Sequence, residues 1–117
     1  MEQKRTLSLL VDNTPGLLSR VAGLFSRRGY NIETITAGVT ADPRYTRMTV
    51  VLYCSDEMIL EQIKKQLAKL VDVRDIKELK PDESVRRELM LVKIRVNENE
   101  RRNVHRHLRC LRGRIVD

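Results

Sequence analysis

The spacing of apolar residues divides the first 80 residues into six elements. Residues 46–53 alternate, with Met48, Val50 and Leu52 on one face, which is typical of a half-buried strand. Residues 17–28 instead repeat their apolar residues with helical spacing. In chain order the pattern predicts a strand over 6–11 and a helix over 17–28 that Gly29 caps. Strands over 30–39 and 46–53 follow, joined by a turn over 40–45. A second helix, capped by Ser55 or Asp56 and buried through Ile59, Ile63, Leu67 and Leu70, leads to a last strand over 71–79.

The order β-α-β-β-α-β predicts an α+β fold of the ferredoxin-like kind. Right-handed crossovers then give a four-stranded antiparallel sheet with both helices on one face. The first and third strands are central, and the second, which carries Asn31, Thr34 and Thr36, is an unpaired edge. Because nothing in its sequence blunts this edge, we expect a homodimer that pairs through the second strand.

The turn from the first strand into the first helix is the candidate ligand site. Its residues predict Thr14 as the helix N-cap and Pro15 as the first helical position. Gly16 would leave the first backbone N–H groups open to a carboxylate or phosphate, and Asn13 adds an amide that both donates and accepts. The alternative is an ordinary, well-capped strand-to-helix turn.

Residues 81–117 predict a second, unfinished unit. Residues 81–87 form a polar linker, and 88–96 alternate as a strong strand. A helix follows from about 98 to 112, buried through Val104, Leu108 and Leu111 and ended by Gly113, and a further strand begins at 114–117. The predicted domains are therefore 1–80, the linker 81–87, and 88–117 as the truncated β-α-β start of a C-terminal domain.

The net charge of +7 admits a rival function. Six of the arginines lie between residues 101 and 114, a segment that could bind nucleic acid, an acidic protein or nothing. A basic sheet of this topology could be an RNA-binding module, but such modules stack bases on aromatic residues of the central strands, and here only Tyr53 lies near the end of one. We therefore expect no nucleic acid as partner.

Membrane insertion and catalysis find no support in the sequence. No run reaches the length of a membrane span, and two separated cysteines, Cys54 and Cys110, favour a cytoplasmic chain with reduced thiols. His105 and His107 lie two residues apart, so they face different sides of a helix and predict no metal site. Without a nucleophile beside a base, a P-loop or paired carboxylates, the chain is predicted not to be an enzyme.

Several segments resemble one family, in its order and at its spacing. The chain is similar to the small, regulatory subunit of acetolactate synthase (acetohydroxyacid synthase), which begins with an ACT domain. The segments that carry the resemblance are N-T-P-G-L-L-S-R-V-A-G-L-F-S-R-R-G-Y-N-I-E (13–33), A-D-P-R-Y-T-R-M-T-V (41–50), E-Q-I-K-K-Q-L-A-K-L-V-D-V (61–73), R-E-L-M-L-V-K-I (87–94) and L-R-G-R-I-V-D (111–117).

The resemblance implies a regulatory function in branched-chain amino-acid biosynthesis. Such subunits bind the catalytic subunit of acetolactate synthase, stimulate it and confer feedback inhibition, usually by valine. Thiamine diphosphate (ThDP), FAD and Mg²⁺ belong to the catalytic subunit, so no cofactor is expected on this chain.

The resemblance also implies where the effector binds. It would lie at the ACT dimer interface, in contact with the loop of Asn13, Thr14, Pro15 and Gly16 and with Asn31 of the partner chain. We expect Asn13 and Asn31 to hold its polar ends and Leu17 and Ile35 to form an apolar wall. Family members continue for some tens of residues, which complete a second ferredoxin-like domain, but the expected effector site lies wholly in the first.

Overall fold

The computed structural model of the chain describes residues 3–116. It divides into two compact units, Met1–Arg86 and Arg87–Asp117. The elements of the first unit are β1 (Gln3–Asp12), α1 (Leu17–Arg27), β2 (Ile32–Val39), β3 (Tyr45–Cys54), α2 (Glu57–Ala68) and β4 (Val73–Glu78).

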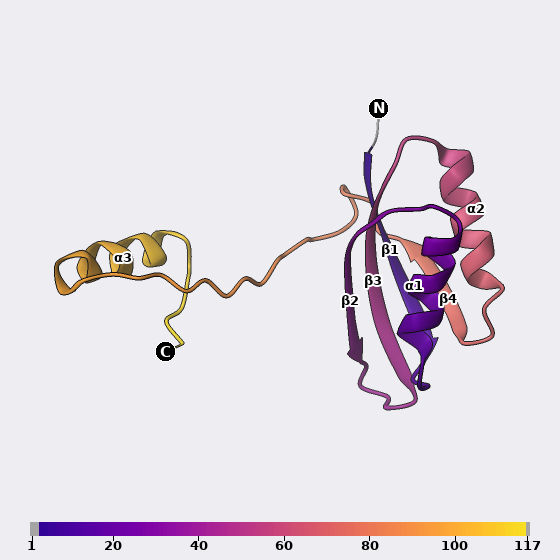
Figure 1. Cartoon of the computed structure of the whole chain (residues 1–117), viewed down its shortest axis with the longest axis horizontal. Helices are drawn as coiled ribbons and strands as arrows, with labels where there is room; N and C mark the ends of the chain where they lie inside the picture. Colours follow the sequence, from indigo (N-terminus) through magenta and orange to yellow (C-terminus); the bar gives the residue numbers. More distant parts are fainter. Residues whose placement is uncertain (1–2, 117) are drawn as a thin grey trace. The chain divides into compact units, whose positions relative to one another are not determined.

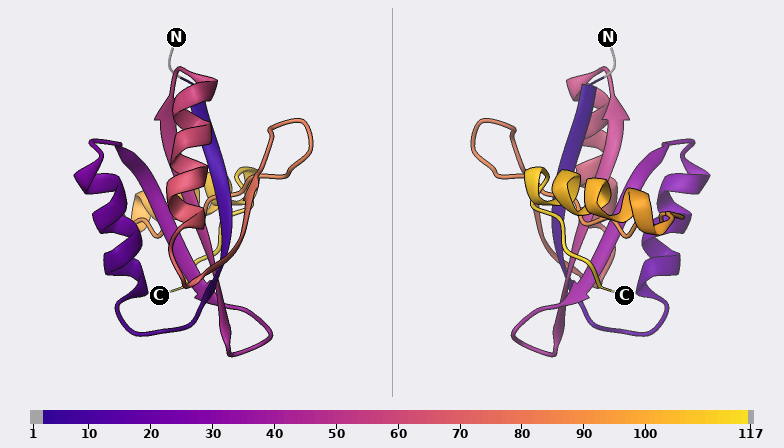
Figure 2. Two further views of the ribbon diagram at one scale, coloured as in Figure 1. Left: turned by 90° about the vertical axis from the view of Figure 1, so that its right-hand side faces the viewer. Right: turned by 90° about the vertical axis from the view of Figure 1, so that its left-hand side faces the viewer.

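The first unit has the predicted topology. Its four strands form one antiparallel sheet in the order β2-β3-β1-β4, so β1 and β3 are central and β2 and β4 are edges. Both helices cover the same face of the sheet (Figure 1, Figure 2). The α+β, ferredoxin-like βαββαβ fold is therefore confirmed.

One hydrophobic core lies between the sheet and the two helices. The inward positions of β1 and β3 are fully buried because alternate side chains of a strand point to the same face. Burying each such side chain stabilises the fold by about 1.5–3 kcal/mol. The core consists of Leu7, Leu9, Val11, Leu17, Val21, Leu24, Phe25, Met48, Val50, Leu52, Cys54, Leu60, Ile63 and Leu67.

The buried stripe of α2 differs from the prediction at Ile59 and Leu70. Leu70 lies after the helix, which ends at Ala68, and is only partly buried. Leu60 is fully buried, whereas Ile59 is 37% exposed and lies outside the core. Residues 59, 63 and 67 fit helical spacing as well as 60, 63 and 67 do, so the pattern did not separate Ile59 from Leu60, and the packing of α2 on the sheet places Leu60 inward. The predicted role of Ile59 in the core is therefore wrong.

The start of α2 and the end of α1 have recognisable capping residues. Of the two predicted caps for α2, Asp56 is the one used, since its carboxylate accepts from the Met58 backbone N–H at 2.9 Å. At the end of α1 the C-cap is Arg28, one residue before Gly29, the predicted cap. Gly29 follows directly, with a φ of 72°. Glycine is suited to that left-handed position because it has no Cβ.

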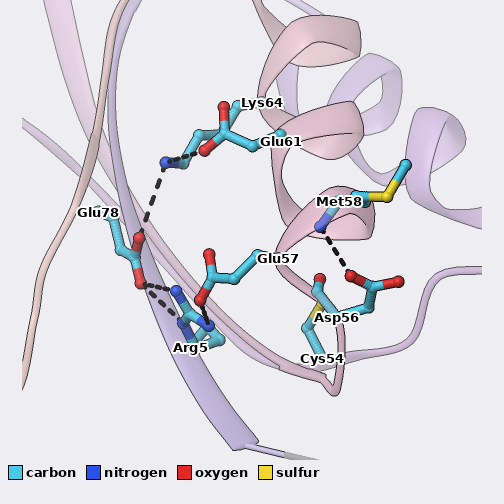
Figure 3. A network of polar contacts seen from close by, with 8 residues as sticks. All are labelled: Arg5, Cys54, Asp56, Glu57, Met58, Glu61, Lys64 and Glu78. Carbon is cyan, nitrogen blue, oxygen red and sulfur yellow. Dashed lines mark hydrogen bonds and ion pairs between the residues drawn. The ribbon is translucent and has the colours of Figure 1, made fainter.

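A polar network fastens β1, α2 and β4 together at the end of the sheet where β1 begins (Figure 3). The guanidinium of Arg5 donates to Glu57 Oε1 at 2.6 Å and to Glu78 Oε1 at 2.7 Å. Lys64 approaches Glu61 at 3.1 Å and Glu78 at 3.7 Å. The Arg5 side chain is only 15% exposed, and its hydrogen bond to Glu57 holds the pKa of that carboxyl below its usual value.

Over its described residues, 87–116, the second unit contains one helix, α3 (Glu98–Cys110). Its N-terminus has a capping box, in which Asn97 accepts from the Glu100 backbone and the Glu100 side chain accepts from the Asn97 backbone. The helix face predicted to be buried is not, because Val104 and Leu108 are only partly covered and Leu111 is 80% exposed.

The strands expected in this unit are not formed among its described residues. Residues 88–96 and 114–116 have no strand pairing, and Asp117 lies outside the described residues. A strand requires a hydrogen-bonded neighbour, which residues 87–116 do not supply. α3 ends at Cys110, before the predicted end at Gly113, and Arg112 has a left-handed φ of 56°. The Gly113 N–H donates to the Leu108 carbonyl at 2.7 Å.

Candidate functional site

The loop between β1 and α1 is held in place by two neighbouring turns. The backbone N–H of Asn13 donates to the Arg44 carbonyl at 2.8 Å, and its side-chain Nδ2 donates to the Pro43 carbonyl at 3.2 Å. These bonds fasten the loop to the β2–β3 turn. On the other side, the Asp12 N–H donates to the carbonyl of Asp72, in the α2–β4 loop, at 2.8 Å.

The N-terminus of α1 is uncapped, which corrects the sequence prediction. The N-cap residue is Gly16, in a left-handed conformation with a φ of 77°, and no side chain caps the helix. Thr14 and Pro15 lie in the turn before the helix, so the predicted cap at Thr14 and first helical position at Pro15 are wrong. Because Gly16 turns the chain after them, the Thr14 hydroxyl contacts Asp72 and Arg20 and does not reach the helix N–H groups.

An uncapped helix N-terminus has donors for an anion. Helix geometry leaves the N–H groups of Leu18 and Ser19 without an intrahelical acceptor, and the Leu17 N–H reaches only the Thr14 carbonyl, at 3.4 Å. The end of the helix also carries partial positive charge. The arrangement suits a small carboxylate, as the sequence suggested, although the helix starts later.

Two charged residues beside this loop were missed in the sequence. The Arg20 guanidinium forms an ion pair with Asp72 at 2.6 Å and donates to Thr14 Oγ1 at 3.2 Å. The available signal was an arginine in the first helical turns of a segment without an acidic residue in its first turn. Asp72 could not be found in this way, because it lies 52 positions from Arg20 in the sequence.

The remaining predicted residues lie elsewhere in the same chain. Asn31 is exposed and immediately precedes β2, and Ile35 is part of the exposed face of β2. Leu17 is buried in the core, whereas its neighbour Leu18 is 53% exposed. Leu17, which was expected to form part of an apolar wall of the site, therefore does not lie on the surface.

Within one chain, Asn31 and the loop lie at opposite ends of the sheet. Ile32 and Arg5 both pair with Leu52 of β3, so Asn31 is close to the level of Arg5. Asn13 follows Arg5 by eight residues, which corresponds to about 25 Å along a strand. A single small molecule cannot contact Asn13 and Asn31 of the same chain.

Two carboxyl groups near the loop, those of Asp12 and Asp42, are paired with arginines that lower their pKa values. Hydrogen bonds from Arg74 at 2.8 and 2.9 Å lower the pKa of Asp12, and those from Arg44 lower the pKa of Asp42 to about 2. Groups with such low pKa values do not exchange protons near neutral pH, so they are suited to holding the loop and not to acid–base chemistry.

Other kinds of site are not found among the described residues. No group of His, Cys, Asp and Glu there could hold a metal ion, and His105 and His107 are both exposed. No helix among residues 3–116 has the length and apolar character needed to cross a bilayer. Of three surface hollows, the largest is about 430 Å³, lies between α2 and β4, and includes none of residues 13–17.

The fold, the open loop and the free edge strand together define a regulatory domain of the ACT type. The family described as AHAS small subunit-like ACT domain matches residues 7–75. The chain belongs to this family of acetolactate synthase small subunits, which is the family that the sequence predicts.

Curated relatives support this assignment over nearly the whole chain. The chain is 51% identical over 114 residues to the acetolactate synthase isozyme 3 small subunit of Salmonella typhimurium, covering 97% of this chain and 69% of that protein. It is 48% identical over 112 residues to the probable acetolactate synthase small subunit of Methanothermobacter thermautotrophicus, covering 95% and 66%.

Solved structures agree. The acetolactate synthase small subunit of Thermotoga maritima aligns with a TM-score of 0.81 at 31% identity, covering 98% of this chain and 71% of that one. The ACT domain of the GTP pyrophosphokinase of Chlorobium tepidum aligns with a TM-score of 0.58 at 16% identity, covers 68% of this chain and supports the fold alone.

These relatives confirm the predicted function class. The chain is a non-catalytic, regulatory small subunit of acetolactate synthase, the enzyme of branched-chain amino-acid synthesis that the resemblance pointed to. They favour this function over the RNA-binding module that the fold class and charge had left open.

Proposed function

We propose that two copies of this chain bind a branched-chain amino acid, valine, between them and thereby control the catalytic subunit of acetolactate synthase. Each site would combine the β1–α1 loop of one copy with the start of β2 of the other. Binding would inhibit a catalytic subunit that this chain otherwise stimulates. ThDP, FAD and Mg²⁺ would belong to that subunit, and the cytoplasmic location stays a prediction.

The observation that carries the proposal is the register of β2. Its last residue, Val39, pairs with Thr46, as does Val11 of β1, so β2 ends beside the loop that holds Asn13. If two β2 strands pair antiparallel about their midpoints, the residue before one strand lies opposite the residue after the other. Asn31 of one copy then lies level with Thr40 of its neighbour, next to the loop.

The state of the β2 edge supports this pairing. In the single chain, every β2 residue after Ile32 is exposed, although β2 carries Ile35 and Val39. Both residues pair with inward-facing residues of β3, so they lie on the helix side of the sheet, at its rim. A second copy would cover these side chains and pair the free backbone groups of the edge.

The chemistry of a zwitterionic amino acid matches the groups available. The helix N-terminus would accept the carboxylate, and the Asn13 side-chain oxygen, whose amide nitrogen already donates to Pro43, would accept from the ammonium group. The amide of Asn31 from the second copy would close the site. Ile35 lies four residues further along β2, about 13 Å from Asn31, so its predicted part as an apolar wall stays untested. The predicted part of Leu17 stays untested and requires its side chain to leave the core.

Mixing two defective variants tests the proposal. Asn13→Ala and Asn31→Ala should each abolish most valine binding, measured by calorimetry. In a mixed dimer one site carries both substitutions and the other carries neither, because each site takes Asn13 and Asn31 from different chains. Random mixing should therefore restore about a quarter of the valine sites.

Two outcomes would contradict the proposal. Absence of any restored binding in a folded, fully exchanged mixture would mean that the site does not combine these residues from two chains. Normal valine binding by Asn31→Ala alone would remove the edge strand from the site. Thermal unfolding of each variant controls for misfolding: Asn31→Ala should leave the melting temperature nearly unchanged, and Asn13→Ala, which loses its hydrogen bond to Pro43, should lower it by only a few degrees.

A further inference from the structure

We propose that Arg20 is a further effector-binding residue, which recognises the effector's carboxylate, and that Asp72 holds Arg20 in position for it. The inference rests on the proposed effector site and adds a residue that the sequence pattern did not indicate. It assigns part of the preference for an amino acid over derivatives that lack the carboxylate to one side chain.

The position of the Arg20 guanidinium is the first support. Arg20 is the fourth residue of α1, and its side chain folds back over the N-terminus of the helix, as long side chains on helices commonly do. Its Nη1 is 3.5 Å from the Pro15 carbonyl oxygen and would lie 3.4 Å from a Cβ added at Gly16. The cation therefore lies against the glycine at which the proposed carboxylate docks.

The charge of this end of the helix is the second support. A cation at a helix N-terminus is electrostatically unfavourable, because that end already carries partial positive charge. The first turn of α1 has no acidic residue, and the carboxylate that pairs with Arg20 is that of Asp72, in the α2–β4 loop. The helix N-terminus and the Arg20 guanidinium together form a surface that an additional anion would stabilise.

The hydrogen bonds of Arg20 leave donors for that anion. Nη2 is occupied by Asp72 at 2.6 Å and by Thr14 at 3.2 Å. Nη1 has only the long contact to Pro15. A carboxylate can accept from Nη1 and from the helix N–H groups together, without displacing Asp72.

Asp72 is suited to a positioning role. Its side chain is 18% exposed, against 46% for Arg20, and its backbone carbonyl is fixed by the Asp12 N–H. A partly buried carboxylate on a fixed backbone restricts where the guanidinium can lie. Asp72 therefore acts through Arg20 and does not itself touch the ligand.

Combining a substitution of Arg20 with a change in the ligand's carboxylate tests the role of Arg20. Calorimetry would compare valine with valinamide, in which a neutral amide replaces the carboxylate, at a pH where both ammonium groups are charged. The wild-type chain should prefer valine, and Arg20→Gln should reduce that preference by roughly tenfold or more, because a charge-assisted hydrogen bond is lost only with valine. Arg86→Gln is the matched control, since Arg86 is exposed, lies far along the chain from the loop, donates to the Leu79 carbonyl and should leave the preference unchanged.

Asp72→Asn separates positioning from direct contact. The substitution should reduce the preference for valine in the wild-type background and have no further effect in Arg20→Gln. An additional loss in the double variant would show that Asp72 acts independently and overturn its positioning role.

The outcomes distinguish this inference from the proposed function. If Arg20→Gln weakens both ligands equally, or neither, the residue is structural and the inference fails while the effector site stands. If the wild-type chain and Arg86→Gln both fail to bind valine, the proposed function fails and this inference with it.

Discussion

Substitutions of Gly16 separate backbone strain from charge at the proposed effector site. The φ of 77° lies in the left-handed region, which costs a residue with a Cβ about 1 kcal/mol. The added Cβ would also lie 3.4 Å from Arg20 Nη1, a contact that a flexible guanidinium can relieve. Gly16→Ala should therefore lower the melting temperature by about 5 °C.

Gly16→Asp should lower the melting temperature less than Gly16→Ala does. Aspartate enters the left-handed region more readily than alanine, because its short polar side chain hydrogen-bonds locally, and here its carboxylate can also pair with Arg20. Valine binding should follow the opposite order. The new carboxylate would occupy the place of the effector's own and repel it, so Gly16→Asp should bind valine far more weakly than Gly16→Ala.

Gly16→Asn is the matched control for charge, since it has nearly the same shape as aspartate and also tolerates the left-handed conformation. We expect valine affinity at least roughly tenfold lower for aspartate than for asparagine, which corresponds to about 1.4 kcal/mol. Thermal unfolding and calorimetric titration of the three variants measure both orders. Equal valine affinity for the aspartate and asparagine variants would refute the idea that a carboxylate docks at this helix end.

Two further predictions concern the ion pairs that hold the fold. Arg5→Met leaves the carboxylate of Glu78 without its principal partner, so it should lower the free energy of unfolding by about 2 kcal/mol and the melting temperature by about 10 °C. Adding Glu78→Gln should recover part of this lost stability. An undiminished melting temperature in Arg5→Met would mean that the network contributes nothing to stability. Because Arg44 lowers the pKa of Asp42 from 3.8 to about 2, the stability that this pair contributes is fully present above pH 4 and is lost as the pH falls towards 2. NMR titration of the Asp42 carboxyl should give a midpoint near 2 that returns towards 3.8 in Arg44→Gln, and equal midpoints would contradict this pairing.

The sequence was sufficient for the topology of the first unit because each local pattern agrees with the fold. The alternation of Met48, Val50 and Leu52 marks a buried strand face, and Asp56 provides a conventional helix cap. The prediction was wrong where several local rules competed. At residues 14–16, the rules for Thr and Pro placed the helix start two residues early, because the left-handed conformation of Gly16 was not visible in composition.

The second unit and the candidate site show the limits of local patterns. Residues 88–96 have a strong strand pattern, but a strand forms only with a neighbour to pair with. The open loop at Asn13 and Gly16 could be predicted from turn chemistry. The contact of Arg20 with Asp72 could not, because it joins α1 to the α2–β4 loop and depends on the tertiary fold.

The most direct test of the account is calorimetric titration of the purified chain with valine, with leucine, isoleucine and lysine as comparisons. We expect saturable binding of valine at roughly one site per chain in a dimer, and weaker binding of lysine, whose charged side chain is costly to bury in a site that receives an aliphatic one. A folded, dimeric chain that gives no saturable heat with valine would contradict the claim that two copies of this chain form the effector site.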